Sequence, residues 1–203
     1  MKIGIINTHT SNIKSVINAV NFLGFKNFKL ITENTNQEFT HIIMPGNGNY
    51  KSNMDIVIKN KLDTLINNHF EKNKFFLGIC VGMQILSTYG FETKKEKGLN
   101  IINGEVVRIP VKKKRLPHIG WNDLKIVKND EITKNIDNMS SFYFLHSYYF
   151  DLKKKNENLI GSVFYEKDLP VFIKKNNFYG VQFHPEKSQH KGLRLLNTFL
   201  KLK

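Results

Sequence analysis

A single cysteine lies between two glycines in the run Phe75-Phe76-Leu77-Gly78-Ile79-Cys80-Val81-Gly82-Met83-Gln84-Ile85-Leu86. An apolar segment that leads into Gly-x-Cys-x-Gly and then into a helical pattern is typical of a nucleophile elbow, a sharp strand-to-helix turn that exposes one side chain. The turn strains the backbone at the nucleophile, so only small neighbours such as Gly78 and Gly82 fit beside it. The N–H of Val81 then opens the helix and points to where an oxyanion would form. Because a lone cysteine in an apolar run is more often an inert core residue, catalysis by Cys80 needs support from elsewhere in the chain.

That support comes from the run Gly180-Val181-Gln182-Phe183-His184-Pro185-Glu186-Lys187-Ser188. The run predicts a buried strand with His184 at its carboxyl end, and Pro185 fixes the backbone between His184 and Glu186. A histidine beside a cysteine takes up the thiol proton, and its imidazole needs a third group that fixes the tautomer. Taken alone, His184 more often ends a strand and Glu186 is more often a solvated charge. Together with Gly-x-Cys-x-Gly, the residues favour a triad of Cys80, His184 and Glu186.

The elements that position these residues alternate between strand and helix in the first half of the chain. Buried strands are expected at residues 2–6 and 39–44 and before the elbow, and a short strand at residues 28–31. Helices are expected at residues 12–24, 54–59 and 61–72. Short strands follow, expected at residues 104–109, 124–127, 142–145, 160–165, 171–173 and 178–183, before an amphipathic helix at residues 192–200. The fold class is therefore α/β, with a mostly parallel sheet flanked by helices and with antiparallel strands added to one side.

A loop with two glycines, Pro45-Gly46-Asn47-Gly48-Asn49-Tyr50, follows the strand at residues 39–44. Glycines let backbone N–H groups point freely, so this loop is a candidate part of the site, although an ordinary strand-to-helix turn explains it about equally well. In an open parallel sheet, chemistry takes place at the carboxyl ends of the strands. Both the loop and Cys80 are expected there.

The length of 203 residues suits one domain, residues 1–203, and the single cysteine excludes an intramolecular disulfide. No signal peptide and no apolar run of about 18 residues is present, so we expect a cytoplasmic protein. The net charge of +14 suggests nucleic-acid binding, but the lysines are scattered and no aromatic-basic motif accompanies them. The one dense run, Lys112-Lys113-Lys114-Arg115, is expected to face water rather than a partner.

Two of these runs, at residues 78–84 and 182–186, resemble the signatures of the triad-type, class I glutamine amidotransferases. Two further runs, Pro117-His118-Ile119-Gly120-Trp121-Asn122 and Tyr143-Phe144-Leu145-His146-Ser147-Tyr148, resemble the glutaminase subunits of imidazole glycerol phosphate synthase. The Pro-His-x-Gly-Trp-Asn run separates those subunits from the glutaminases of anthranilate, guanylate, cytidylate and pyridoxal phosphate synthesis. The resemblance covers the whole chain and implies a flavodoxin-like domain that uses no cofactor and no metal.

The resemblance implies that Cys80 attacks the side-chain amide of glutamine, that His184 relays the proton and that Glu186 orients His184. Ammonia then leaves, and the γ-glutamyl thioester is hydrolysed to glutamate. Three groups of binding residues are implied as well: an oxyanion hole at Val81, Asn47 and Gly48, a glutamine site at Gln84, Glu92, Ser147 and Tyr148, and a partner surface at Asn12, Pro117, Ile119, Gly120, Trp121 and Asn122. The implied partner is a TIM-barrel cyclase that receives ammonia through a channel, and its ligand rearranges the loop at residues 45–48.

Two departures from the family pattern leave the pathway open. The turn after the first strand reads Asn7-Thr8-His9-Thr10-Ser11-Asn12 where relatives carry Asp-Tyr-Gly-x-Gly-Asn, and Asn47 stands where relatives usually have valine. Both lie where the family meets its partner or couples to it. The chain is therefore an ordinary histidine-pathway subunit or a diverged paralogue that serves another amidating synthase, such as one that makes amidino sugars. The partner-facing Trp121 argues against a stand-alone cysteine hydrolase, and the intact triad argues against a docking protein without catalysis.

Overall fold

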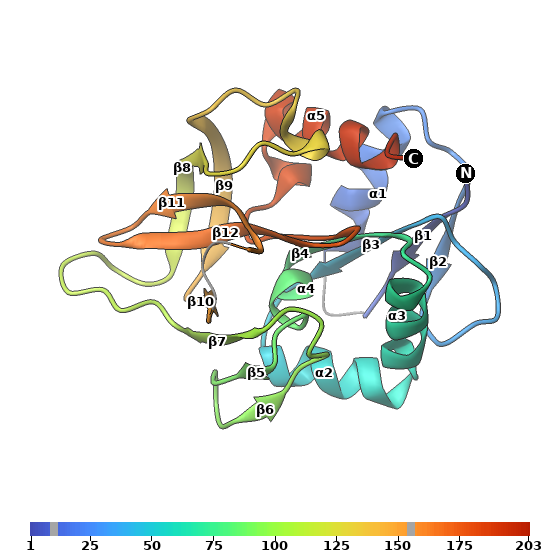
Figure 1. The fold of residues 1–203 in the computed structure, drawn as a ribbon, viewed down its shortest axis with the longest axis horizontal. Coiled ribbons are helices and arrows are strands. Elements are labelled where there is room, and N and C mark those ends of the chain that lie inside the picture. Colours follow the sequence, from blue (N-terminus) through green and yellow to red (C-terminus); the bar gives the residue numbers. More distant parts are fainter. Residues whose placement is uncertain (9–11, 154–156) are drawn as a thin grey trace.

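The computed structural model describes residues 1–8, 12–153 and 157–203 and contains a large mixed sheet with helices on both faces (Figure 1). The nine strands of this sheet follow the order β2-β1-β3-β4-β13-β12-β11-β8-β9. A second sheet of four strands has the order β10-β7-β5-β6 and lies below the large sheet in this view. The predicted α/β class, with antiparallel strands added to one side of a parallel sheet, is confirmed.

The parallel half of the large sheet positions the site. Its strands are β2 (Phe28–Ile31), β1 (Ile3–Ile6), β3 (His41–Gly46), β4 (Phe75–Cys80) and β13 (Phe178–Val181). Strands β1, β3, β4 and β13 are buried along almost their whole length because helices cover both faces, which explains their continuous apolar runs. The register pairs Gly46 with Cys80, so the loop after β3 and the elbow after β4 begin at the same edge of the sheet.

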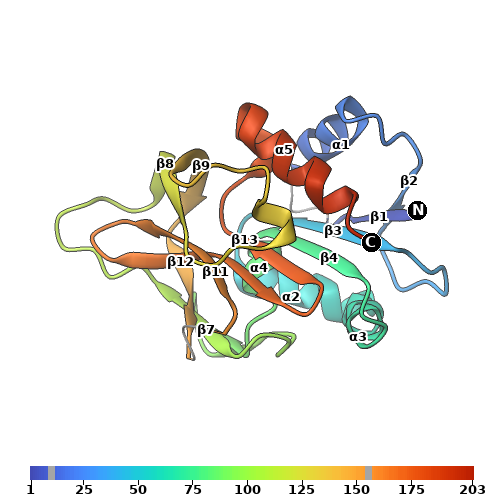
Figure 2. The same ribbon diagram turned by 45° about the horizontal axis from the view of Figure 1, so that its top comes forward.

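Helices α1 (Ile13–Phe22) and α5 (Gln189–Leu200) cover one face of this half, and α2 (Tyr50–Lys59) and α3 (Leu62–Glu71) cover the other (Figure 1, Figure 2). Helix α2 begins earlier than predicted because Asn49 caps it by accepting a hydrogen bond from the N–H of Ser52 at 3.2 Å. Helix α4 (Val81–Gln84), after the elbow, is shorter than its pattern suggests. Within the described residues, no helix combines the length and the apolar character needed to cross a membrane.

The antiparallel half consists of β12 (Asp168–Lys175), β11 (Leu159–Phe164), β8 (His118–Ile126) and β9 (Ser140–His146). The strand predicted at residues 124–127 in fact begins at His118, because β8 pairs with β9 from His118 opposite His146 to Leu124 opposite Ser140. The predicted end of the strand at residues 178–183 was also wrong. Strand β13 ends at Val181, so His184 lies in the loop beyond the strand rather than at its last position.

The smaller sheet contains β10 (Tyr148–Leu152), β7 (Gly104–Arg108), β5 (Tyr89–Gly90) and β6 (Glu96–Lys97). Only β7 was predicted, since β5 and β6 have two residues each and β10 directly follows another strand. Strands β9 and β10 are separated by Ser147 alone, yet they belong to different sheets. The chain therefore crosses from the large sheet to the small one at Ser147.

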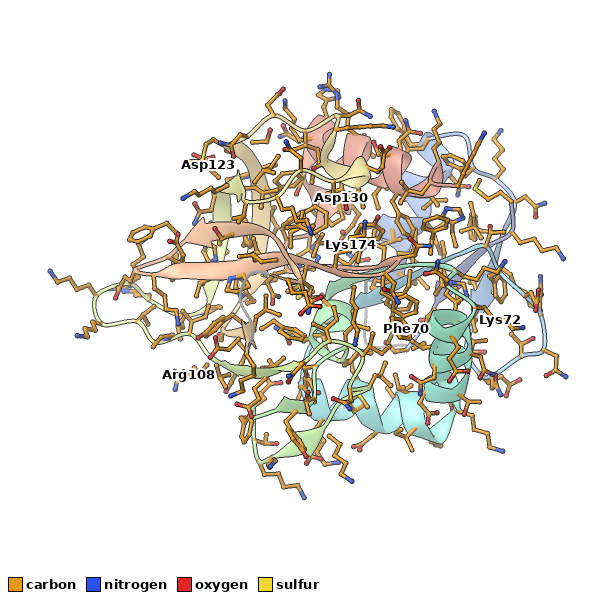
Figure 3. The ribbon with its side chains drawn as sticks, viewed as in Figure 1. Phe70, Lys72, Arg108, Asp123, Asp130 and Lys174 are labelled. Atoms are coloured by element: carbon orange, nitrogen blue, oxygen red, sulfur yellow. The ribbon has the colours of Figure 1, made fainter. Side chains whose placement is uncertain are left out.

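A polar cluster fixes the turn Glu131–Thr133 to the large sheet. Asp130 caps this turn by accepting from the N–H of Ile132 at 3.2 Å, and its carboxylate pairs with Lys174 of β12 (Figure 3). The hydroxyl of Tyr179 donates to the same carboxylate at 3.2 Å. The cluster joins β12, β13 and the turn that precedes β9.

The dense basic run at residues 112–115 is exposed. Its backbone is held by Glu166, whose carboxylate accepts hydrogen bonds from the N–H groups of Lys112 at 2.7 Å, of Lys113 at 2.8 Å and of Lys114. These hydrogen bonds lower the pKa of Glu166. One acidic side chain thus orders a segment whose own charges repel one another.

Candidate active site

Cys80 occupies a strained turn between β4 and α4. Its backbone has φ 55° and ψ −112°, a conformation that costs a non-glycine residue about 1–3 kcal/mol. Two glycines allow the turn to pack closely. A Cβ atom on Gly82 would lie 2.0 Å from the carbonyl oxygen of Met44, and one on Gly78 would lie 2.3 Å from the carbonyl oxygen of Gly82. This is the geometry that the Gly-x-Cys-x-Gly spacing predicts for an elbow.

The loop after β13 brings His184 and Glu186 to the elbow, because β13 is the neighbour of β4. Nδ1 of His184 donates to Oε1 of Glu186 at 2.8 Å, and both side chains are buried. Burial disfavours the charged imidazolium, but the neighbouring Cys80 sulfur and the Glu186 carboxylate outweigh it and raise the pKa of His184 to about 10. Nε2 of His184 is buried and has no hydrogen-bond partner among the described residues. His184 is therefore charged at neutral pH and is the partner that a cysteine thiolate needs.

Two further groups contact the sulfur of Cys80. The side-chain amide of Gln182 donates to Sγ at 3.5 Å, and Sγ lies 4.0 Å from the carbonyl oxygen of Leu145. Neither residue was expected to act at the nucleophile. The signal for Gln182 was present, since it lies two positions before His184 and alternate residues of an extended segment point the same way.

A cleft of about 600 Å³ opens above the elbow. Its lining comes from the loop after β3, the elbow, the segment before β6, the residue before β8 and the crossing from β9 to β10: Asn47, Gly48, Asn49, Cys80, Val81, Gln84, Glu92, Pro117, Leu145, His146, Ser147 and Tyr148. The structure thus gathers the residues of the predicted oxyanion hole and glutamine site around Cys80. The volume is in the range of small-molecule sites.

The loop after β3 is held by Asn53 of α2. The buried amide of Asn53 donates to the carbonyl oxygen of Asn47 at 2.8 Å and to that of Asn49 at 2.9 Å. Gly48 has φ +76°, which glycine adopts without strain. On the other side of Cys80, the N–H of Val81 is the first of α4 and so has no acceptor within its own helix. Backbone from both segments therefore borders the space in front of Cys80.

Glu92 is anchored at the rim of the cleft. Its Oε2 accepts from the N–H of Tyr50, the first residue of α2, at 2.5 Å, and its carbonyl oxygen accepts from the hydroxyl of Tyr148 at 3.2 Å. Gln84 is buried, and its Nε2 donates to the carbonyl oxygen of Tyr148 at 3.2 Å and to Oε1 of Gln182 at 2.9 Å. Both N–H bonds of Gln84 are thus used within the protein, which leaves its oxygen for a ligand.

Two buried histidines that were assigned no role from the sequence lie beside the cleft. Nδ1 of His118 and Nε2 of His146 are 3.0 Å apart, and Nδ1 of His146 lies 2.8 Å from the carbonyl oxygen of Tyr148. Because a carbonyl only accepts, His146 donates through Nδ1 and accepts through Nε2 from His118. Burial lowers the pKa of His118 to about 4 and that of His146 to about 3, so both rings are neutral at pH 7.

An apolar patch lies next to the cleft on the edge strands of the large sheet. Ile119 and Trp121 are 58% and 49% exposed. They pair across the strands with Leu145 and Tyr143, so the four side chains share one face of β8 and β9. Leu145 also lines the cleft, which makes the patch continuous with the opening above Cys80.

The other residues predicted to meet a partner are placed differently. The side chain of Asn122 points to the opposite face of β8 from Trp121, where its Nδ2 lies 3.2 Å from Nε2 of His118. Pro117 lines the cleft, and Gly120, with φ +121°, lies within β8. Asn12 is exposed at the start of α1, and the divergent turn before it lies partly outside the described residues, at positions 9–11.

Residues 5–202 match the family described as Glutamine amidotransferase class-I. The chain is 39% identical over 199 residues to the Imidazole glycerol phosphate synthase subunit HisH of Caldanaerobacter subterraneus subsp. tengcongensis, covering 97% of this chain and 96% of the relative. It is 37% identical over 205 residues to the subunit of the same name from Methanocaldococcus jannaschii, covering 98% of this chain and 99% of the relative. A crystal structure described as that of a glutamine amidotransferase is similar with a TM-score of 0.75 at 18% identity, covering 98% of this chain and 97% of that one. By sequence along nearly its whole length and by fold, this chain belongs to the class-I glutamine amidotransferases.

Proposed function

We propose that the chain is the glutaminase subunit of an imidazole glycerol phosphate synthase, acting as one domain in the cytoplasm. It hydrolyses L-glutamine to glutamate and ammonia and passes the ammonia to a TIM-barrel cyclase in histidine biosynthesis. The observation that carries this proposal is that Cys80 lines the cleft and that His184, hydrogen-bonded to Glu186, lies beside Cys80. The Pro-His-x-Gly-Trp-Asn run and the subunit names of the relatives support the pathway.

The reaction follows from the charged His184 and the sulfur beside it. The Cys80 thiolate attacks the carboxamide carbon, and the C–N bond breaks as the imidazolium donates its proton to the leaving nitrogen, which releases ammonia. Neutral His184 then takes a proton from water as the water oxygen attacks the thioester, and the C–S bond breaks to give glutamate and the thiolate. Glu186 holds the imidazole through Nδ1 throughout both steps.

The residues around the cleft supply the binding. The N–H of Val81 and an N–H of the loop at Asn47 and Gly48 stabilise the oxyanion, and one such donor is worth about 10²–10³ in rate. The carboxylate of Glu92, fixed at the start of α2, suits the ammonium group of the substrate. Gln84 offers its free oxygen, and Ser147 and Tyr148 line the same cleft.

The apolar patch at Ile119 and Trp121 is the surface that we assign to the cyclase. Its support is the exposure of a tryptophan beside the mouth of the catalytic cleft, where ammonia leaves. We include Pro117, Gly120 and Asn12 in the contact, and Asn122 as the residue that supports the patch from behind.

The test measures glutamate release by the purified chain alone and after mixing with a histidine-pathway cyclase and its nucleotide ligand. We expect slow release alone and strong stimulation in the mixture, which Cys80→Ala abolishes without weakening the complex. Glutaminase near the unmodified level in Cys80→Ala would remove Cys80 from its role. A catalytically active chain that the cyclase never stimulates would instead indicate the paralogue that serves another synthase.

A further inference from the structure

We propose that Gln182 is a positioning residue for the nucleophile: its side-chain amide donates to the sulfur of Cys80, holds the sulfur at the cleft and favours its ionised form. The inference rests on the proposed function, which makes Cys80 the nucleophile but gives Gln182 no part. Gln182 is completely buried, and its Nε2 lies 3.5 Å from Sγ. A thiolate is a better acceptor than a thiol, so a buried donor aimed at the sulfur favours the thiolate.

The surrounding hydrogen bonds fix which end of the Gln182 amide meets the sulfur. The carbonyl oxygen of Tyr148 can only accept, so the group of Gln84 that lies 3.2 Å from it is the NH₂. The same NH₂ lies 2.9 Å from the Gln182 amide, which therefore presents its oxygen to Gln84. The nitrogen of Gln182 is left facing Cys80.

The network continues beyond Tyr148 and makes this orientation hard to reverse. The carbonyl oxygen of Tyr148 also accepts from His146 at 2.8 Å, and His146 in turn accepts from His118 at 3.0 Å. Each group has one donor–acceptor role that satisfies its neighbours. Rotating the Gln182 amide by half a turn would set NH₂ against the NH₂ of Gln84 and would leave the sulfur facing a carbonyl oxygen.

The two contacts of the sulfur agree with this assignment. The carbonyl oxygen of Leu145, which could accept from the sulfur, is 4.0 Å away, and the amide nitrogen of Gln182, which donates to it, is 3.5 Å away. The closer contact is therefore the one in which the sulfur accepts. Gln182 and His184 come from the same short segment after β13. The donor and the proton carrier therefore keep a fixed position relative to each other.

Alkylation of Cys80 by iodoacetamide tests the inference without glutamine. The thiolate attacks the methylene carbon, a C–S bond forms and iodide leaves, so the rate follows the ionised fraction of the only cysteine. Gln182→Met keeps the length of the side chain but removes the donor. We expect the midpoint of the rate against pH to rise by about one pH unit. Gln37→Met, outside the cleft, is the matched control and should leave the midpoint unchanged.

Gln182→Asn is the second variant, because it keeps a buried amide but shortens it so that the donor no longer reaches the sulfur. We expect the same rise in the midpoint, and in glutamine hydrolysis a kcat lowered about tenfold with KM within about twofold. His184, Glu186 and His146, the titratable groups around the sulfur, are present in every variant. An unchanged midpoint in either folded variant overturns the inference, even if stability falls. If the variants raise the midpoint of the alkylation rate against pH but the wild-type chain hydrolyses no glutamine, the proposed function is wrong and the role of Gln182 is still supported.

Discussion

This protein should lose stability at a higher pH than protonation of its carboxylates alone would cause, because four of its histidines are buried and neutral. Burial lowers the pKa of His41, His69 and His118 to about 4 and that of His146 to about 3. In the unfolded chain each of these rings has a pKa of about 6.5. The unfolded state therefore binds more protons between about pH 4 and 6.5, and stability is lost as the pH falls through this window.

The size of the effect follows from proton counting. At pH 5.5 each of the four rings is about 90% protonated in the unfolded chain and almost unprotonated in the folded one, so each contributes a slope of about 1.2 kcal/mol per pH unit. Together they remove about 5 kcal/mol between pH 7 and 5.5, comparable to the whole stability of many domains. The contribution of His184 to stability has the opposite pH dependence and changes in a higher pH range. Its pKa is raised to about 10, so its contribution is complete below about pH 6.5 and is lost as the pH rises towards 10.

Urea unfolding followed by circular dichroism from pH 7.5 to pH 5 measures this slope. His69→Gln, on α3 and away from the cleft, should lower the slope near pH 5.5 by about 1.2 kcal/mol per pH unit. His190→Gln is the matched control because His190 is exposed, and it should leave the slope as it is. A wild-type slope close to zero, or the same slope in His69→Gln as in the wild type, would refute the reasoning.

Two substitutions test the site and its scaffold. Glu186→Gln keeps the shape of the side chain but removes the charge that holds Nδ1 of His184. Steady-state kinetics should show a kcat for glutamine lowered about 10²–10⁴-fold with little change in KM. A kcat within a factor of a few of the wild-type value would show that Glu186 is dispensable. Gly82→Ala would place a Cβ atom 2.0 Å from the carbonyl oxygen of Met44, so the elbow must shift. We expect the free energy of unfolding to fall by about 1–3 kcal/mol and activity to fall about 100-fold, and unimpaired activity would mean that the strain relaxes away from Cys80.

The sequence predicted the parallel half of the fold because its strands are buried on both faces. Strands β1, β3 and β4 read as unbroken apolar runs, and such runs need no knowledge of their neighbours to be recognised. Strand β8 was predicted only at its end, since Gly120 and Asn122, which have low strand propensity, interrupt its first half, and that half is held by pairing with β9. Pairing of that kind depends on residues distant in the chain.

The proximity of Cys80, His184 and Glu186 was predictable for a similar reason, because each of these residues carries a local signal. Cys80 has flanking glycines, and Pro185 ties His184 to Glu186. Gln182 carries a signal only for the side on which it lies, two positions before His184, and the hydrogen bonds that connect it with Gln84 and the two histidines near the cleft carry none. They join five segments of chain, and their donor and acceptor roles become defined only when all are in place.

The passage of the backbone between the two sheets at Ser147 has a mechanical consequence. Strand β9 is the last strand of the large sheet, and Tyr148, the next residue after Ser147, begins β10 and forms a wall of the cleft. A partner that binds β8 and β9 and tilts them must therefore also move Tyr148, because Ser147 alone is too short a connection to absorb the movement. Force applied at the rim would in this way be delivered to the mouth of the catalytic chamber through covalent bonds alone.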